Sequence, residues 1–128
     1  MNYSEISDFD LNCAVAGALG REFFSNEKPD DSRRRRKSYE IDGKHRDVCE
    51  SGWTSELFAP CNSWADAGPI IQKNKIDINW AMQRGNVRQP YARNSAPGLS
   101  GHAGYIHENP LRAAMIVFLM MQEATNAA

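Results

Sequence analysis

Several features that would mark a particular environment are scarce or absent in this 128-residue sequence. Its three cysteines, Cys13, Cys49 and Cys61, contain no CxxC pair and form no even disulfide framework, so we expect reduced thiols in a reducing compartment. The longest apolar run, 113–121, has nine residues, whereas a membrane-spanning helix needs roughly 20. The first residues lack a basic segment followed by an apolar run, unlike a secretory signal. Together these absences predict a soluble cytoplasmic protein.

An excess of charge of one sign is also missing. Fifteen Lys and Arg stand against 16 Asp and Glu, so the formal net charge of −1 selects no class of partner. Hydrophobic residues make up 41% of the chain and occur in groups, which excludes disorder throughout. We therefore expect one compact domain over 1–128, with a modest core and without an internal repeat.

The first predicted helix covers 8–19. Ser7 can cap its N-terminus, and Asp10 stands in the place of a capping-box acid. Apolar residues follow at helical spacing, and Gly20 suits the C-terminal cap.

A second, shorter helix is predicted over 67–74. Placing Asp66 at its N-cap makes Pro69 the third helical residue, where the missing N–H has no intrahelical partner in any case. Asn74 tolerates the left-handed conformation that would end the helix. Apolar and polar residues then alternate over 75–80, which predicts a strand with Trp80 on the apolar side.

The last helix is predicted from Leu111 to Glu123, with Asn109 as its cap and Pro110 at the favoured first position. Because 113–121 is apolar all round, the helix should be buried on most sides or form a subunit interface. Such an interface could join two copies of the chain as a homodimer. Its candidate residues are Met115, Phe118 and Met121.

Outside these elements the pattern is weaker. A short strand is expected around Tyr39 and Ile41, ending in a turn at Gly43, and another at 87–91. The polar stretch 21–37 and the glycine-rich stretch 94–107 are predicted to be flexible loops.

Three segments resemble a known family. They are 1–9 (MNYSEISDF), 58–76 (FxPCNxxxDAxPIIxxNxI) and 109–121 (NPLRAAMIVFLMM). The chain is similar in them to the NinX-type proteins of lambdoid phages and prophages. The resemblance implies a phage-encoded protein acting in the cytoplasm of a bacterial host. It also implies an α+β fold, a single-domain sandwich of a small antiparallel sheet with about three helices. No catalytic residue or cofactor is carried over, because the family has no assigned biochemical function.

The strongest candidate site is a basic segment within 33–46, where seven Lys and Arg stand against Glu40 and Asp42. Such a cluster can attract phosphates, and alternate residues of a strand would share one side. One alternative is a solvated loop or edge strand, whose charges prevent pairing with the strands of other chains. Another is contact with an acidic protein surface. The candidate contact residues are Arg33, Arg34, Arg35, Arg36, Lys37, Lys44 and Arg46.

Other constellations are less specific. A second basic group (Lys75, Arg84, Arg88, Arg93) accompanies Trp80 and Tyr91, but we place Trp80 in the core. His45 and Cys49 are zinc-ligand types without a second closely spaced pair. Ser100 lies near His102, but this loop lacks both a P-loop lysine and a complete nucleophile elbow. We therefore expect no catalytic residue, metal or cofactor.

The sequence favours a non-catalytic phage accessory protein that binds a host or phage protein and has no membrane partner. The alternative is nucleic-acid binding through 33–46, and an enzyme ranks third.

Overall fold

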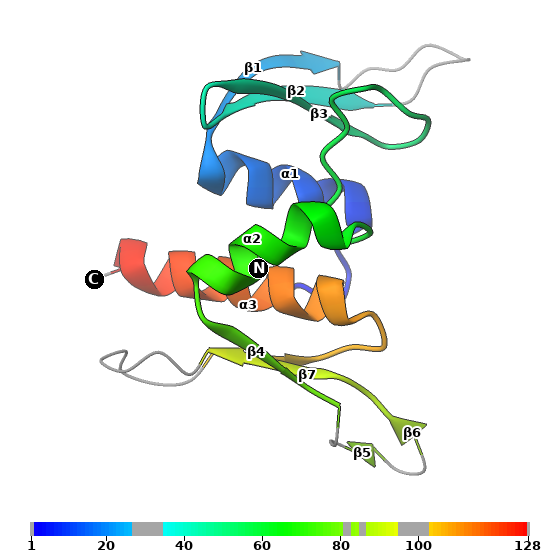
Figure 1. The fold of residues 1–128 in the computed structure, drawn as a ribbon, viewed down its shortest axis with the longest axis vertical. Helices are drawn as coiled ribbons and strands as arrows, with labels where there is room; N and C mark the ends of the chain where they lie inside the picture. The colour runs from blue at the N-terminus through cyan, green and yellow to red at the C-terminus, as the bar shows by residue number, and fades with distance from the viewer. Residues whose placement is uncertain (1, 27–34, 81–82, 85–86, 95–102, 128) are drawn as a thin grey trace. The chain divides into compact units, whose positions relative to one another are not determined.

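The computed structural model describes residues 2–26, 35–80, 83–84, 87–94 and 103–127 (Figure 1). The chain forms two compact units, Met1–Ala59 and Pro60–Ala128. Within these described ranges, three helices and two small antiparallel three-stranded sheets confirm the α+β class. The prediction of one domain over 1–128 stays a prediction, and we describe each unit by itself.

The first unit is a helix on a sheet. Helix α1 (Asp8–Leu19) contacts β1 (Arg21–Asn26), β2 (Arg36–Ile41) and β3 (Lys44–Cys49), which form an antiparallel sheet in the order β1-β2-β3 (Figure 1). Buried side chains of α1 and of the sheet form the core of this unit: Leu11, Val15, Tyr39, Ile41 and Val48.

The ends of α1 confirm the prediction. The Ser7 hydroxyl accepts a hydrogen bond from the Asp10 backbone N–H at 3.1 Å, and the Gly20 N–H donates to the Ala16 carbonyl at 2.9 Å. A Cβ atom at Gly20 would collide with the backbone oxygen of Glu40. Glycine therefore lets the chain turn from the helix directly into β1 beside β2.

Strand β1 contradicts the loop predicted over 21–37, as β2 does from Arg36 onward. The polar composition of 21–26 indicated a loop, but pairing with β2 satisfies its backbone on one side. The register shifts between Glu22 and Phe24, which marks a β-bulge. The remainder of that predicted loop, 27–34, lies outside the described residues.

The other edge of this sheet is partly covered by the chain itself. Leu57 forms a parallel bridge with Asp47 on β3. The Asp47 N–H donates to the Glu56 carbonyl at 2.9 Å, and the Phe58 N–H donates to the Asp47 carbonyl at 2.8 Å. The segment after β3 therefore loops back and runs beside that strand in the same direction.

The second unit places a long helix on a second sheet. Strands β4 (Ile76–Asn79), β7 (Tyr91–Asn94) and β8 (Gly104–Ile106) form an antiparallel sheet in the order β4-β7-β8. Helix α3 (Pro110–Ala127) contacts these strands and α2 (Trp64–Lys73). A separate two-stranded ribbon joins β5 (Gln83–Arg84) to β6 (Val87–Arg88).

Helix α3 is buried all round over 111–119, as its apolar composition predicted. The Asn109 side chain accepts hydrogen bonds from the backbone N–H groups of Leu111 at 2.9 Å and Arg112 at 3.3 Å, which confirms the predicted cap. Neither α3 nor another helix of the described chain has a stretch long and apolar enough to cross a membrane.

Helix α2 begins earlier than predicted. Ser63, rather than Asp66, is the N-cap residue, so Pro69 lies inside the helix. Because proline has no N–H, the helical hydrogen bond to the carbonyl of residue 65 is missing. The helix continues despite this loss. At the other end Asn74 has a φ of −95°, and Lys75 takes the positive φ, 55°, that we had expected at Asn74.

Two further predictions in the second unit need correction. Strand β8 lies within 94–107, where a loop was expected; part of that stretch, 95–102, is outside the described residues. The strand over 75–80 is confirmed as β4, but Trp80 is 55% exposed rather than in the core. Because β4 ends at Asn79, its alternation does not extend to Trp80.

Candidate interaction surface

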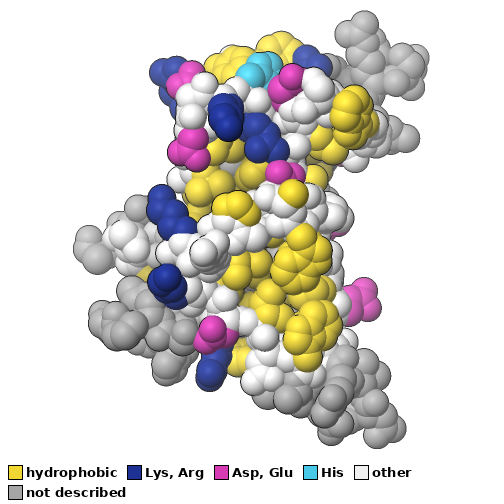
Figure 2. Space-filling view, viewed as in Figure 1, with side chains coloured by type: hydrophobic (Ala, Val, Ile, Leu, Met, Phe, Trp, Pro, Cys, Tyr) yellow, Lys and Arg dark blue, Asp and Glu magenta, His cyan; other side chains and the backbone are white. Residues whose placement is uncertain are grey.

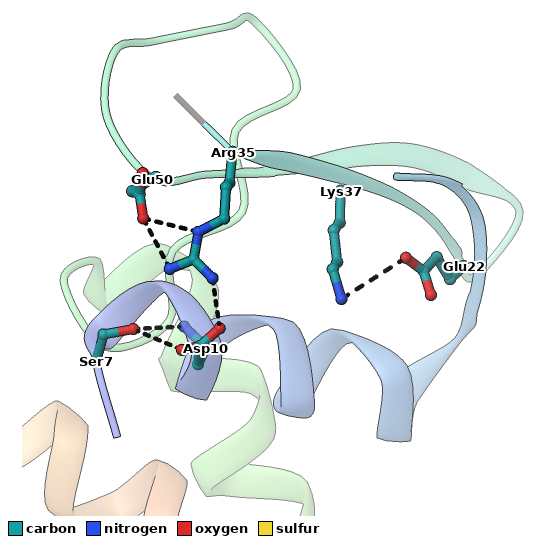
Figure 3. A network of polar contacts seen from close by, with 6 residues as sticks. All are labelled: Ser7, Asp10, Glu22, Arg35, Lys37 and Glu50. Carbon is teal, nitrogen blue, oxygen red and sulfur yellow. Dashed lines mark hydrogen bonds and ion pairs between the residues drawn. The ribbon is translucent and has the colours of Figure 1, made fainter. Parts of the chain in front are cut away.

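The predicted basic residues that the structure describes do not form one surface. Arg33 and Arg34 lie outside the described residues. Arg35 and Lys37 extend from the start of β2 toward α1, as Figure 3 shows. Arg36 lies between them in the sequence and therefore on the opposite face of the sheet. The side chains alternate between the two faces of the sheet, as expected for a strand, and this alternation divides the basic segment between the two faces.

The two residues on the α1 side meet carboxylates. One Arg35 nitrogen lies 2.7 Å from the Glu50 carboxylate and another 3.6 Å from Asp10, while the guanidinium carbon is 4.6 Å from the centre of the Phe9 ring. The hydrogen bond to Glu50 raises the pKa of Arg35 above its ordinary value. Lys37 lies 4.0 Å from Glu22. Both cations are therefore paired with carboxylates of this chain.

Arg46 also has an internal role. Its guanidinium donates to the backbone carbonyls of Leu57 at 2.8 Å and Glu56 at 3.3 Å, and lies 4.9 Å from the centre of the Phe58 ring. Lys44, at the start of β3, is exposed. Of the described candidates, Arg36 and Lys44 therefore extend most freely into solvent.

The face of the sheet opposite α1, which we call the outer face, displays aromatic side chains that sequence reasoning missed. Phe23 is 53% exposed and Phe24 is 43% exposed. In a regular strand, consecutive side chains point to opposite faces, but the bulge in β1 allows both rings to lie on the outer face. The adjacent phenylalanines were visible in the sequence, whereas the bulge was not.

A nitrogen-bearing side chain accompanies each ring. The Arg36 guanidinium carbon lies 5.1 Å from the centre of the Phe24 ring. The His45 ring meets Phe23 edge-on, with 5.1 Å between ring centres and 80° between ring planes. Arg21 lies 3.7 Å from Glu40, and both of these side chains remain largely exposed. Figure 2 shows hydrophobic, basic, acidic and histidine side chains over this sheet.

Beside these rings, Asp47 forms the centre of a polar network. Its carboxylate accepts hydrogen bonds from Ser38 at 2.6 Å and Thr54 at 3.1 Å, and lies 2.6 Å from His45 Nε2. Burial raises the pKa of Asp47, but these hydrogen bonds more than offset it, so the pKa lies below the ordinary value. Ser38 is buried and donates to the aspartate rather than to the histidine, so the three residues are not arranged as a catalytic triad.

Thr54 belongs to a connecting loop, 50–57, that is fixed at both ends. The Glu50 N–H donates to the Arg35 carbonyl at 2.9 Å, and the Asp47 N–H on β3 donates to the Glu56 carbonyl at 2.9 Å. Between these anchors Trp53 is 78% exposed. The loop therefore holds a large aromatic side chain in solvent, a second feature that sequence reasoning missed.

The candidate interface on α3 is largely internal. Met115 is 0% exposed and Phe118 is 2% exposed, while Met121 is half-buried. An interface through these three residues stays a prediction, and of the three only Met121 reaches the surface.

Among the residues that the structure describes, the remaining candidates do not gather into a site. Within the described ranges, no group of three His, Cys, Asp or Glu residues could hold a metal ion. Ser100 and His102 lie outside those ranges. In the second basic group, Arg93 lies 3.8 Å from Asp77, Lys75 is exposed, and the side chains of Arg84 and Arg88 are not described.

Comparison with known proteins agrees with the sequence resemblance. A family model described as bacteriophage P22 NinX matches residues 2–122. No curated protein matches the chain. Since the matched region extends over nearly the whole sequence, the chain belongs to the bacteriophage P22 NinX family.

Proposed function

We propose that this phage accessory protein is a non-catalytic protein-interaction module that acts in the cytoplasm of the bacterial host. The observation that carries the proposal is Trp53, 78% exposed on a loop whose two ends are fixed to the sheet. Tryptophan is enriched among the residues that dominate binding energy at protein interfaces. A loop that is ordered before binding also loses less conformational entropy when a partner arrives.

The charges around Trp53 favour a protein over a polyanion. The loop 50–57 contains Glu50 and Glu56 and has no Lys or Arg. Glu50 is paired with Arg35, whereas Glu56 is exposed. A partner pocket that is apolar at its centre and neutral or basic at its rim would complement this loop.

Photo-crosslinking through position 53 tests the proposal. A photoreactive amino acid replaces Trp53 in the full-length protein, which is irradiated in host cells with and without phage infection. We expect one dominant crosslinked protein that survives nuclease treatment. The matched control carries the same group at Trp80, which is also an exposed tryptophan but lies in the second unit. The same weak products from both positions would contradict the proposal.

Nucleic-acid binding through the basic segment 33–46 is the second candidate. It is favoured by one observation, the placement of the Arg36 guanidinium 5.1 Å from the exposed Phe24 ring. Arginine and aromatic side chains together are typical of surfaces that bind single strands. Because Arg35, Lys37 and Arg46 contact groups of this chain, the candidate depends on the outer face rather than on the whole segment.

A further inference from the structure

We propose that the outer face of β1 and β2 binds single-stranded nucleic acid, with bases stacked on Phe23 and Phe24 and the backbone held by Arg36. The inference rests on the second candidate function above. It specifies the form of nucleic acid and moves the contact from the basic segment as a whole to three side chains.

The first argument is the exposure of the two rings. Phe23 and Phe24 are 53% and 43% exposed, although burial of a phenylalanine side chain is favourable. The β-bulge brings both to the outer face of a sheet, where neither is needed to cover the core beneath α1. A sheet surface with neighbouring exposed rings suits the faces of successive unpaired bases.

The second argument is the charge beside the rings. Arg36 and Arg21 are exposed cations on this face. Of the two carboxylates, Glu40 lies beside Arg21, while Asp47 is buried and accepts hydrogen bonds from the chain itself. Because Arg21 and Glu40 offset each other, the accessible net charge is that of Arg36, and the two arginines together lie within reach of one or two phosphates.

These numbers define the kind of binding expected. Stacking contributes affinity that depends little on salt, while one or two phosphate contacts give a slope of log K against log salt of about −0.7 to −1.4 for a single strand. A duplex keeps its bases stacked on one another, so it cannot use the phenylalanines. Single strands should therefore bind more tightly than duplexes of the same length.

Fluorescence anisotropy with a labelled twelve-nucleotide oligo-dT and a duplex of equal length tests the proposal on the full chain. Phe23→Ala and Phe24→Ala should each weaken oligo-dT binding by about fivefold or more, because loss of a stacked base typically has at least this effect. Arg36→Gln should weaken binding and reduce the salt slope by about 0.7. Trp64→Ala is the matched control, since it removes an aromatic side chain that is 57% exposed in the second unit.

Trp53→Ala separates this proposal from the proposed protein interaction. It should leave oligo-dT affinity unchanged, and failure of oligo-dT binding would not affect crosslinking through position 53. Equal affinity for the duplex, no binding of oligo-dT, or unchanged affinity in both phenylalanine variants would overturn the inference. Should a variant fail to fold, fluorine NMR of the wild-type chain labelled with fluorophenylalanine replaces it. Two of the five phenylalanine resonances should then shift on adding oligo-dT, and no shift would also overturn the inference.

Discussion

The hydroxyl of Ser38 on β2 donates a hydrogen bond of 2.6 Å to the carboxylate of Asp47 on β3, and both side chains are buried. The two residues face each other directly in the strand register. This buried hydrogen bond joins β2 to β3 through their side chains on the outer face. Removing the Ser38 hydroxyl should therefore lower the stability of the fold more than the small size of this group suggests.

Ser38→Ala should lower the free energy of unfolding by about 1–2 kcal/mol, because it removes a donor to a buried carboxylate. Urea denaturation followed by far-UV circular dichroism measures the change. Ser25→Ala is the control, since Ser25 lies on the exposed strand β1 and should have little effect. Equal stability of the two variants would show that the buried hydrogen bond contributes nothing.

Asp47 should also make stability depend on pH. Because its pKa in the folded protein is below the ordinary value of 3.8, the charged carboxylate stabilises the fold above that pH. The contribution is lost as pH falls below 3.8 and through the pKa of the folded state. The difference in unfolding free energy between wild type and Asp47→Asn should therefore be largest near neutral pH and shrink toward pH 3. A difference that does not vary with pH would contradict this assignment.

The cysteines should differ in reactivity. Burial raises the pKa of Cys13 to about 11, and Cys61 is fully buried. Cys49 is only half-buried, although burial and the nearby Asp47 also raise its pKa. Iodoacetamide at pH 8, with peptide mass spectrometry, should modify Cys49 first in the folded protein and all three at similar rates in urea. Modification of Cys13 as rapid as that of Cys49 in the folded state would be inconsistent with this structure.

Substitutions in α3 should distinguish core from surface. Met115→Ala should lower the free energy of unfolding by about 2–5 kcal/mol, because the side chain is fully buried. Met121→Ala should have a much smaller effect, because Met121 is half-buried near the end of the helix.

Sedimentation velocity of the two variants checks the homodimer prediction at the same time. A change of oligomeric state in Met121→Ala, with stability preserved, would place Met121 at a subunit interface.

Helices α1 and α3 could be predicted from the sequence because their determinants are local. Ser7 and Asn109 cap the helices through side chains within three residues of the helical N–H groups that they bind. The start of α2 was missed because Ser63 and Asp66 are both suitable caps, and the backbone tolerates Pro69 inside the helix. Strands β1 and β8 depend on partners distant in sequence, so their polar or glycine-rich composition predicted loops.

The same distinction applies to the candidate site. The basic segment and its alternation were evident, yet no local pattern showed that Asp10 and Glu50 would meet Arg35. The exposure of Phe23 and Phe24 together depends on one irregular position in β1. Trp80 was assigned to the core because its strand was expected to continue one residue further.

The exposure of all three tryptophans has a practical consequence for spectroscopy. Trp53, Trp64 and Trp80 are 78%, 57% and 55% exposed, so their indole rings already meet water in the native state. Unfolding should shift the emission wavelength of the intrinsic fluorescence only slightly, and a flat fluorescence trace would not mean that the protein lacks a folded state. Conversely, collisional quenchers such as acrylamide should reach the native rings readily. Protection from quenching would then report a bound partner, with single-tryptophan variants identifying the ring that it covers.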